Sequence, residues 1–406
     1  MLANWPNAIA LIDADYFFAH CELARHPEHR GKPLMVLGRL GSCILAKSPE
    51  AKALGIGTAM PFWEAKKLCP KGIYLQGDFR YYTLMSRRLM AVLRQWSPVV
   101  EECSIDEAFM DMGGLCDLYR LPFEAIAQKI QSEVKTALGI TVSFGISVNK
   151  TLAKIACEIR KPNGVMAVPG IGIESFLATL PVGEIPGIGF NREALLQKWG
   201  IKTGLQFAHM PHDRVNRLLG QTGLQLWREM RGEVAFPLQS AAVPPKSIGR
   251  TSSFDKPTSN LDWVRGLAVY HLERALESLC DHELFAGELT LYLRDKEFKT
   301  YGFGHRFERP TSDFNEWIVA FQKLFLQIPS NHVWRSAGAF LTRLTPANGQ
   351  QLDLFSDPQK SVQSDRLNQA KQKLNERFGR TTVRSGATLY FNSKCVSKNR
   401  MQMPIQ

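Results

Sequence analysis

The sequence lacks any hydrophobic segment long enough to cross a membrane. The longest apolar run near the start, residues 8–12, ends at Asp13, whereas a spanning helix needs roughly 18 apolar residues. No signal-peptide pattern precedes a cleavage site. With 45% hydrophobic and 22% charged residues, the composition also excludes a wholly disordered chain. We expect a cytoplasmic protein, and its 406 residues predict two to four domains.

Paired cysteine motifs are missing as well. The eight cysteines form no Cys-x-x-Cys pair and no metal-finger spacing, and histidines lie close together only at His26/His29 and His209/His212. Scattered thiols of this kind usually behave as small buried hydrophobes in a reducing compartment. We therefore expect no disulfide and no zinc site.

Acidic residues are outnumbered by basic ones. The chain has 50 Lys and Arg against 38 Asp and Glu, which gives a formal net charge of +12. Such an excess favours an anionic partner, most simply nucleic acid. Residues 356–406 contain ten basic and three acidic side chains. Part of the excess is therefore a basic tail, which could equally bind a partner or keep the chain soluble.

The order of the hydrophobic patterns predicts an α+β multidomain protein. A strand at 8–12, a strand–turn–strand segment at 99–110 and a strand at 141–148 alternate with helical patterns, which predicts a sheet with helices on one face. Short helical segments and a linker-like stretch at 237–245 follow. From residue 246 the order βαββαβ predicts a four-stranded sheet backed by two helices.

Three carboxylates stand at unusual places in the first sheet. Asp13 directly follows an apolar strand, and Asp106 and Glu107 occupy the predicted turn of an apolar hairpin. Neighbouring strands could bring them together, where they would repel one another unless cations were present. Oxygen-only ligands favour Mg²⁺, and such a cluster can hold two ions for phosphoryl chemistry. The alternative is that all three are solvated strand ends.

Other residues could bind anions or simply belong to the fold. Lys52, Lys150 and Lys154 can act as phosphate counter-charges, although lysines on helices are usually solvated. The pair Phe17-Phe18 could form a substrate wall, but adjacent phenylalanines more often belong to a core.

Three further segments carry signals for binding. Residues 186–189, Pro-Gly-Ile-Gly, could expose backbone N–H groups to a phosphate or form a plain helix cap. Residues 246–250 place two cations on an extended strand suited to a phosphate backbone. The amphipathic stretch 351–355 suits a partner's groove, or an anchor that folds back on the protein itself.

Together these motifs resemble the Y-family of translesion DNA polymerases over about residues 8–355. Five motifs stand in the order that the family shows, and the stretch Ser-Ile-Asp-Glu-Ala-Phe is its most diagnostic one. The matching segments are residues 12–18, 103–109, 145–154 with 161–164, 186–189 and 246–250.

The resemblance implies a right-hand polymerase. Its parts would be a catalytic palm, fingers, a thumb with a helix–hairpin–helix, and a βαββαβ little finger. The expected boundaries are 1–14 and 80–169 for the palm, 15–79 for the fingers, 170–236 for the thumb, 237–245 for a linker, 246–346 for the little finger and 347–406 for a basic tail.

The resemblance also implies roles for individual residues. Asp13, Asp106 and Glu107 would ligate two Mg²⁺ ions, with the Ala14 carbonyl as a further ligand. Phe18 falls where the family places the steric gate that excludes a ribose 2′-hydroxyl. The other matched positions are Phe17, Cys43, Leu45, Lys52 and Lys150 for the nucleotide and templating base, and Gly187, Gly189, Lys246 and Arg250 for DNA.

One departure from the commoner family pattern points to a particular branch. The usual Tyr and Arg, three residues apart, are replaced by Pro49 and Lys52. Residues 50–55 instead resemble the branch that contains the catalytic subunit of bacterial DNA polymerase V, as do residues 377–380. The peptide of Gln351, Leu352, Leu354 and Phe355 resembles that branch's sliding-clamp motif.

The expected partners are primer–template DNA, deoxynucleoside triphosphates and a sliding clamp, but no membrane. The branch also implies a processed accessory subunit and a recombinase filament, although the end from Ser385 onward does not show the expected tail. The predicted function is error-prone, template-directed translesion synthesis during DNA repair and the SOS response, in a nucleoid-associated bacterial enzyme. The alternatives are a non-catalytic DNA-bound scaffold of the same fold, and a two-metal nuclease or nucleotidyl cyclase with a similar sheet.

Overall fold

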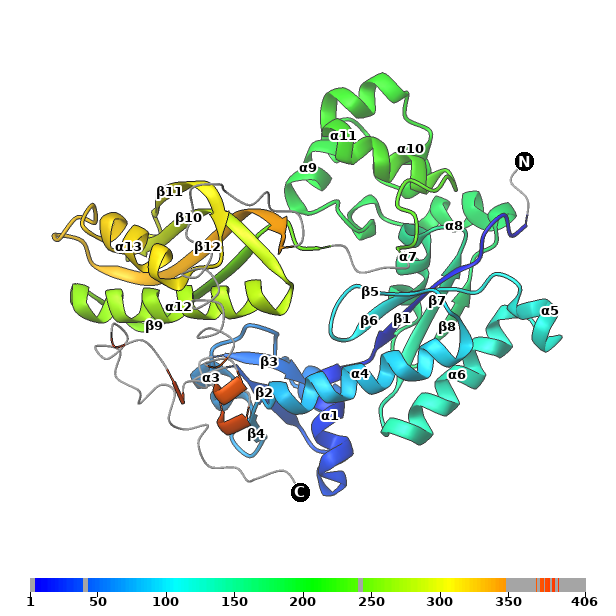
Figure 1. Cartoon of the computed structure of the whole chain (residues 1–406). Helices are drawn as coiled ribbons and strands as arrows, with labels where there is room; N and C mark the ends of the chain where they lie inside the picture. The colour runs from blue at the N-terminus through cyan, green and yellow to red at the C-terminus, as the bar shows by residue number, and fades with distance from the viewer. Residues whose placement is uncertain are drawn as a thin grey trace. The chain divides into compact units, whose positions relative to one another are not determined.

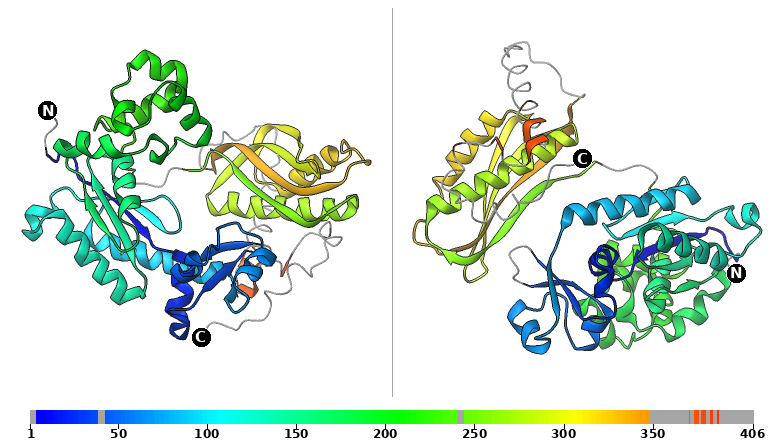
Figure 2. Two further views of the ribbon diagram at one scale, coloured as in Figure 1. Left: turned by 180° about the vertical axis from the view of Figure 1, so that it is seen from behind. Right: turned by 90° about the horizontal axis from the view of Figure 1, so that it is seen from below.

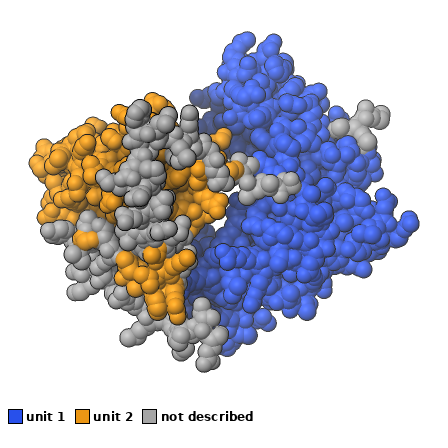
Figure 3. Space-filling view, viewed as in Figure 1, with its two compact units in different colours: residues 1–242 blue, residues 243–406 orange. Residues whose placement is uncertain are grey.

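The computed structural model describes residues 4–38, 43–239 and 244–347, together with the tail positions 370, 373–375, 377–379, 382–383 and 386. The chain forms two compact units, residues 1–242 and 243–406 (Figure 1; Figure 3). Within the described part, no helix combines the length and apolar character required to cross a membrane. The predicted clamp peptide, residues 351–355, lies outside the described residues.

A five-stranded sheet forms the centre of the first unit. Its spatial order is β5-β6-β1-β7-β8, and β1 runs antiparallel to both of its neighbours. The strands are β1 (Ile9–Ala14), β5 (Val100–Glu102), β6 (Glu107–Asp111), β7 (Val142–Ser147) and β8 (Val165–Ala167). The sequence pattern did not predict β8, because three half-buried residues show too short an alternation. This strand runs parallel to β7, which requires the crossover helix α7 (Lys150–Arg160) between them.

Helices cover both faces of this sheet, so the prediction of helices on one face is wrong (Figure 1; Figure 2). On one face, α4 (Phe79–Trp96) and α6 (Phe123–Leu138) pack on Ala10 and Ile12 of β1. On the other face, α7 packs on Ile9 and Leu11. The reason is that β1 is apolar at successive positions and β7 is buried along its whole length, so neither face can be left to water.

A smaller three-stranded sheet adjoins the start of the chain. Its order is β3-β2-β4, with β4 parallel to β2, and β4 was not predicted. The elements of this region are α1 (Phe17–Arg25), a 3₁₀ helix (Pro27–His29), β2 (Leu34–Leu37), β3 (Ile44–Lys47), α2 (Pro49–Ala53), α3 (Phe62–Leu68) and β4 (Ile73–Gln76). A short helix, α5 (Leu115–Tyr119), precedes α6.

The rest of the first unit is helical and packs on the far side of α7. Val148, Leu152 and Ile155 share a core with this region, and the buried carboxylate of Glu229 accepts the backbone N–H of Thr151 at the first turn of α7. The helices are α8 (Ile173–Thr179), α9 (Phe190–Lys198), α10 (Gly204–Ala208) and α11 (His212–Met230), with 3₁₀ helices at Gly170–Gly172 and Val182–Glu184.

The second unit has the predicted βαββαβ order. All pairs in its sheet, β11-β10-β12-β9, are antiparallel, and α12 and α13 bury Leu289, Leu291 and Leu293 on one face. The elements are β9 (Ile248–Thr258), α12 (Leu261–Asp281), β10 (Leu284–Asp295), β11 (Thr300–Thr311), α13 (Phe314–Phe325) and β12 (Trp334–Pro346).

The contact between α7 and the sheet depends on Gly145. A Cβ atom at this position would lie 2.0 Å from the Ala153 carbonyl oxygen and 2.2 Å from the Cys157 nitrogen, both backbone atoms of α7. Gly145→Ala should therefore push α7 away and lower the free energy of unfolding by about 3 kcal/mol. Urea denaturation measures this change. Gly57→Ala is the control, since its Cβ would meet only the Met60 side chain at 3.9 Å; equal losses in both variants would contradict the packing argument.

Candidate active site

The three predicted carboxylates come from neighbouring positions at one end of the central sheet. Asp13, near the end of β1, pairs in register with Glu107, the first residue of β6. Asp106 immediately precedes that strand, and its carbonyl oxygen accepts the backbone N–H of Ala14 at 2.9 Å. The structure thus brings together the two segments that the sequence analysis singled out.

The sequence analysis placed Glu107 in the turn of the hairpin, but it is the first residue of the strand β6. The turn closes earlier because the hydroxyl of Ser104 accepts the backbone N–H groups of Asp106 at 3.3 Å and Glu107 at 3.2 Å. The same hydroxyl donates a hydrogen bond to the Asp106 carboxylate. Ser104 therefore orients Asp106, a role that the sequence did not suggest.

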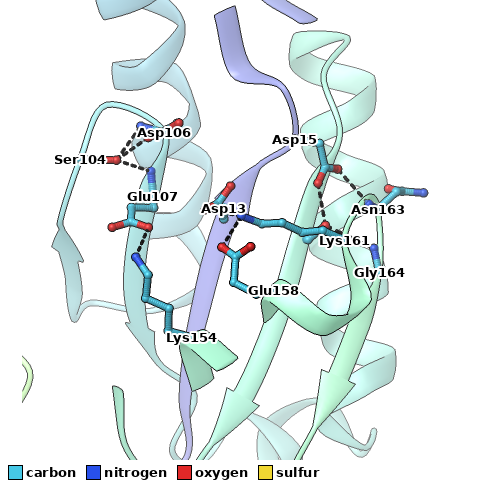
Figure 4. Close-up of polar contacts among 11 residues, drawn as sticks. Asp13, Asp15, Ser104, Asp106, Glu107, Lys154, Glu158, Lys161, Asn163 and Gly164 are labelled. Atoms are coloured by element: carbon cyan, nitrogen blue, oxygen red, sulfur yellow. Dashed lines mark hydrogen bonds and ion pairs between the residues drawn. The ribbon is translucent and has the colours of Figure 1, made fainter. Parts of the chain in front are cut away.

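Lysines from α7 and its C-terminal end neutralise two of the carboxylates (Figure 4). Lys154 Nζ lies 2.7 Å from Glu107 Oε2. Lys161 Nζ lies 2.7 Å from Asp13 Oδ2 and also 2.7 Å from Glu158 Oε1. Asp13 and Glu107 project toward α7 because they alternate with Ile12 and Ala108, which face the opposite core. Cations and carboxylates thus meet in the layer between α7 and the sheet.

Burial sets the protonation behaviour of Asp13. Its side chain is only 14% exposed, and desolvation raises its pKa to about 6, although the hydrogen bond from Lys161 lowers it. Asp106 and Glu158 raise it further through like-charge repulsion. Burial lowers the pKa of Lys161, but the hydrogen bonds to Asp13 and Glu158 outweigh burial and raise it overall.

A buried carboxylate positions Lys161. Asp15 accepts hydrogen bonds from the Ser143 hydroxyl at 2.7 Å and from the backbone N–H of Asn163 at 2.9 Å. The Ser143 hydroxyl also accepts the N–H of Gly164 at 3.4 Å. Asp15 therefore holds the turn after α7 against β7 (Figure 4), and its place two residues after Asp13 was the available sequence signal.

The donor set fits divalent cations. Carboxylate oxygens are the ligands that hard divalent ions prefer, and three carboxylate residues stand here at adjacent backbone positions. Among the described residues, only His26, Glu28 and His29 bring three potential ligand atoms within 4.8 Å of one another. The three carboxylates instead each contact an ammonium group or hydroxyl, so a cation binding there would replace the ammonium groups.

Phe18, the predicted steric gate, is held by other aromatic rings. It stacks on Tyr82 with ring centroids 4.7 Å apart and meets the edge of Phe79 at 5.7 Å. The Tyr82 hydroxyl donates to the buried Glu22 carboxylate at 2.6 Å. Phe17, in contrast, is a core residue with 4% exposure, so its side chain is not accessible to a nucleotide and contact could be made only through its backbone.

The predicted nucleotide-binding lysines lie in different surroundings. Lys52 is exposed on α2. The pKa of Lys47 is lowered mainly by burial and also by the positive charge of Lys52, so the two lysines lie near each other. Lys150 is nearly buried and binds Glu101, which also accepts the N–H of Gln239 at 2.8 Å. The structure therefore assigns the Lys150 ammonium to Glu101 and not to the three carboxylates.

Cys43 and Leu45, the predicted roof over the templating base, are both half-buried at β3. Cys43 forms an isolated bridge with Pro61, and no role in binding follows from that contact.

The predicted DNA-binding positions are only partly available. Gly189 caps the N-terminus of α9 with open space where a side chain would be, and the Gly187 carbonyl accepts a hydrogen bond from Arg192 at 2.8 Å. Lys246 is exposed. The Arg250 guanidinium donates to the Ser278 hydroxyl of α12 at 2.8 Å, and its role in DNA binding stays a prediction.

The family models match most of both units. The impB/mucB/samB family matches residues 12–158, and the C-terminal domain of that family matches residues 245–354. The chain belongs to this family of Y-family DNA polymerases. It is a DNA-directed DNA polymerase of the translesion class with a right-hand fold, and the prediction of family, fold class and function is confirmed.

Individual relatives agree over nearly the whole length. DNA polymerase IV of Desulfatibacillum aliphaticivorans is 32% identical over 384 residues, which are 94% of this chain and 96% of the relative. Protein ImpB of Salmonella typhimurium is 31% identical, with 90% of each chain covered. The solved structure of a Y-family DNA polymerase chimera, Dbh-Dpo4(243-245)-Dbh, matches with a TM-score of 0.71 and 25% identity over 84% of this chain and 99% of that one. Y-family polymerases are nucleotidyltransferases that generally use divalent metal ions.

Because Asp13 is buried, we expect the difference in stability between Asp13→Asn and the natural protein to depend on pH. A raised pKa means that the folded state binds the proton more tightly, so the ionised group destabilises the fold above about pH 6. Asp13→Asn should therefore be more stable than the natural protein by about 1–2 kcal/mol at about pH 8, and the difference should shrink at about pH 5. Urea denaturation at both pH values measures it. A variant less stable at the higher pH would show that the ion pair with Lys161 outweighs desolvation.

Proposed function

We propose that Asp13, Asp106 and Glu107, with the Ala14 carbonyl, hold two Mg²⁺ ions for nucleotidyl transfer from a deoxynucleoside triphosphate to a primer. The observation that supports this most directly is the cross-strand pairing of Asp13 with Glu107, next to Asp106. When bound, such ions lower the pKa of the primer 3′-hydroxyl and stabilise the leaving pyrophosphate. Ser104 orients Asp106, and Asp15 holds the turn that carries Lys161.

We assign the palm to residues 1–14 and 80–169, the fingers to 15–79, the thumb to 170–236 and the little finger to 246–346. The five-stranded sheet, the three-stranded sheet, the helices from α8 to α11 and the second unit support this division. Residues 237–245 serve as the linker and 347–406 as the basic tail, in which residues 351–355 bind a sliding clamp.

Lys161 is a better candidate than Lys150 for the triphosphate. Its ammonium lies on Asp13, so a divalent ion taking its place would release it beside the incoming phosphates. Lys52, with Lys47 close by, supplies positive charge from the fingers, and Phe18 limits the space at the sugar.

The enzyme acts on primer–template DNA and extends primers past damaged bases during DNA repair and the SOS response. The Pro-Gly-Ile-Gly turn supports this reading, since nothing lies within 4 Å of a Cβ built at Gly189, which leaves room for a phosphate to approach the start of α9. A non-catalytic scaffold fits less well, because all three carboxylates stand at adjacent positions and the relatives named above include DNA polymerase IV.

Primer extension on matched undamaged and abasic templates tests the function directly. With Mg²⁺ present, the protein should extend across the lesion. Asp106→Ala should lower the rate by at least about 10³-fold, because a proposed metal ligand would be lost. DNA binding, measured by fluorescence anisotropy, should change little. Equal extension by the variant would exclude the proposed site, and extension lost together with DNA binding would indicate a folding role.

The steric-gate assignment predicts a change in sugar selection. Phe18→Ala would open the space beside Tyr82 that a ribose 2′-hydroxyl needs, so the preference for deoxynucleotides should fall by roughly tenfold or more. Single-nucleotide incorporation kinetics with dNTP and rNTP measure the ratio of kcat/KM. Phe62→Ala is a matched control, because Phe62 packs on Tyr74 elsewhere in the same region. An unchanged ratio for Phe18→Ala would reject the assignment.

A further inference from the structure

The lysines of α7 form a row, and each contacts a different strand of the sheet. Lys150 binds Glu101 of β5, Lys154 binds Glu107 of β6, and Lys161 binds Asp13 of β1. Lys150 and Lys154 are one helical turn apart, and Lys161 directly follows the helix, so all three project to the same side. Only Lys154 and Lys161 contact proposed metal ligands.

These two ammonium groups change the charge of the site. Asp13, Asp106, Glu107 and Glu158 are four carboxylates against two ammonium groups. Two divalent cations added to this set without an anion would change its formal net charge from −2 to +2. A triphosphate supplies the negative charge that balances it and accepts the displaced ammonium groups.

Lys154 and Lys161 differ in whether a carboxylate partner remains for the ammonium group once a cation has displaced it. Lys161 contacts Glu158 as well as Asp13, so it retains a carboxylate partner after leaving Asp13. Lys154 has a single carboxylate partner among the described residues, namely Glu107. Displacing Lys154 therefore leaves its ammonium unpaired in a partly buried place, with the side chain 32% exposed.

We propose that Lys154 is a positioning residue that holds Glu107 as an internal counter-ion in the nucleotide-free enzyme and moves to the triphosphate when divalent cations bind. This inference rests on the proposed metal site and assigns the residue that regulates its filling. Lys154 weakens cation binding before the nucleotide arrives and strengthens nucleotide binding afterwards. The cations are thereby coupled to the substrate.

Cation binding to the full chain can be measured without turnover. Mn²⁺ is titrated in the absence of DNA and nucleotide, and free Mn²⁺ is followed by electron paramagnetic resonance. Lys154→Gln should bind Mn²⁺ roughly three- to tenfold more tightly than the natural protein. Lys154→Arg, which keeps the charge, should bind with natural or lower affinity. Arg160→Gln is the matched control, because it removes the same charge from an exposed position of the same helix and leaves both proposed ligands paired with Lys154 and Lys161.

A second measurement tests the transfer to the triphosphate. With Mn²⁺ saturating, isothermal titration calorimetry with dATP should show weaker nucleotide binding by Lys154→Gln, roughly three- to tenfold, and an unchanged affinity for Arg160→Gln. Opposite changes in cation and nucleotide affinity would not follow from a merely structural role. If circular dichroism shows that Lys154→Gln does not fold, the measurements use Lys154→Met instead, which also removes the charge but keeps an aliphatic side chain.

Asp106→Ala separates the inference from the proposed function. If this variant loses Mn²⁺ binding while Lys154→Gln behaves as the natural protein does, the metal site stands and the role of Lys154 is overturned. The same role is overturned if Arg160→Gln tightens Mn²⁺ binding as much as Lys154→Gln does, because the effect would then be general charge removal. If Asp106→Ala binds Mn²⁺ unchanged, the proposed metal site itself is rejected.

Discussion

The pairing of carboxylates on the sheet with lysines of α7 is the interaction on which the site depends. Asp13 is 14% exposed and lies in register with Glu107, and such charges are tolerated in a protein interior only when they are paired. The ammonium groups can reach them because Gly145 lets the backbone of α7 approach β7 closely. The same helix packs its other side on the helical region through Leu152. The helix α7 thus packs closely on the sheet, supplies the positive charges of the site and attaches the helical region.

Much of the fold follows from local patterns. The strands predicted at residues 8–12 and 141–148 are β1 (Ile9–Ala14) and β7 (Val142–Ser147), because each is an apolar run that stands out from its surroundings. The βαββαβ order of the second unit was equally clear, since its strands are long and its helices amphipathic. The short strands β4 and β8 were missed, because each is defined by parallel pairing to a strand distant in sequence and by no pattern of its own.

The carboxylate side chains of the site could be predicted from the sequence, but most of the lysine side chains that pair with them could not. A carboxylate after an apolar strand is conspicuous, so Asp13 and the pair Asp106-Glu107 could be found from the sequence. A lysine on an amphipathic helix looks the same whether it faces water or an acid. Lys150 was selected but pairs with Glu101. Lys161, which was not selected, pairs with Asp13 and precedes a turn in which Asp15 accepts the backbone N–H of Asn163. That contact joins residues 148 positions apart, which no local pattern encodes.

The two kinds of constraint at the site work differently. Phe18 is held by apolar contact with Tyr82 and Phe79, and Tyr82 is in turn fixed by its hydrogen bond to Glu22. The ring contacts of Phe18 do not depend on charge, so the ring can keep its position when the ionic partners of the carboxylates change. The carboxylates, in contrast, have partners that can be exchanged, because an ammonium group and a metal ion compete for the same oxygens. On the proposed assignments, a rigid apolar wall would select the sugar by shape, whereas an exchangeable ionic cluster would take up cations by charge.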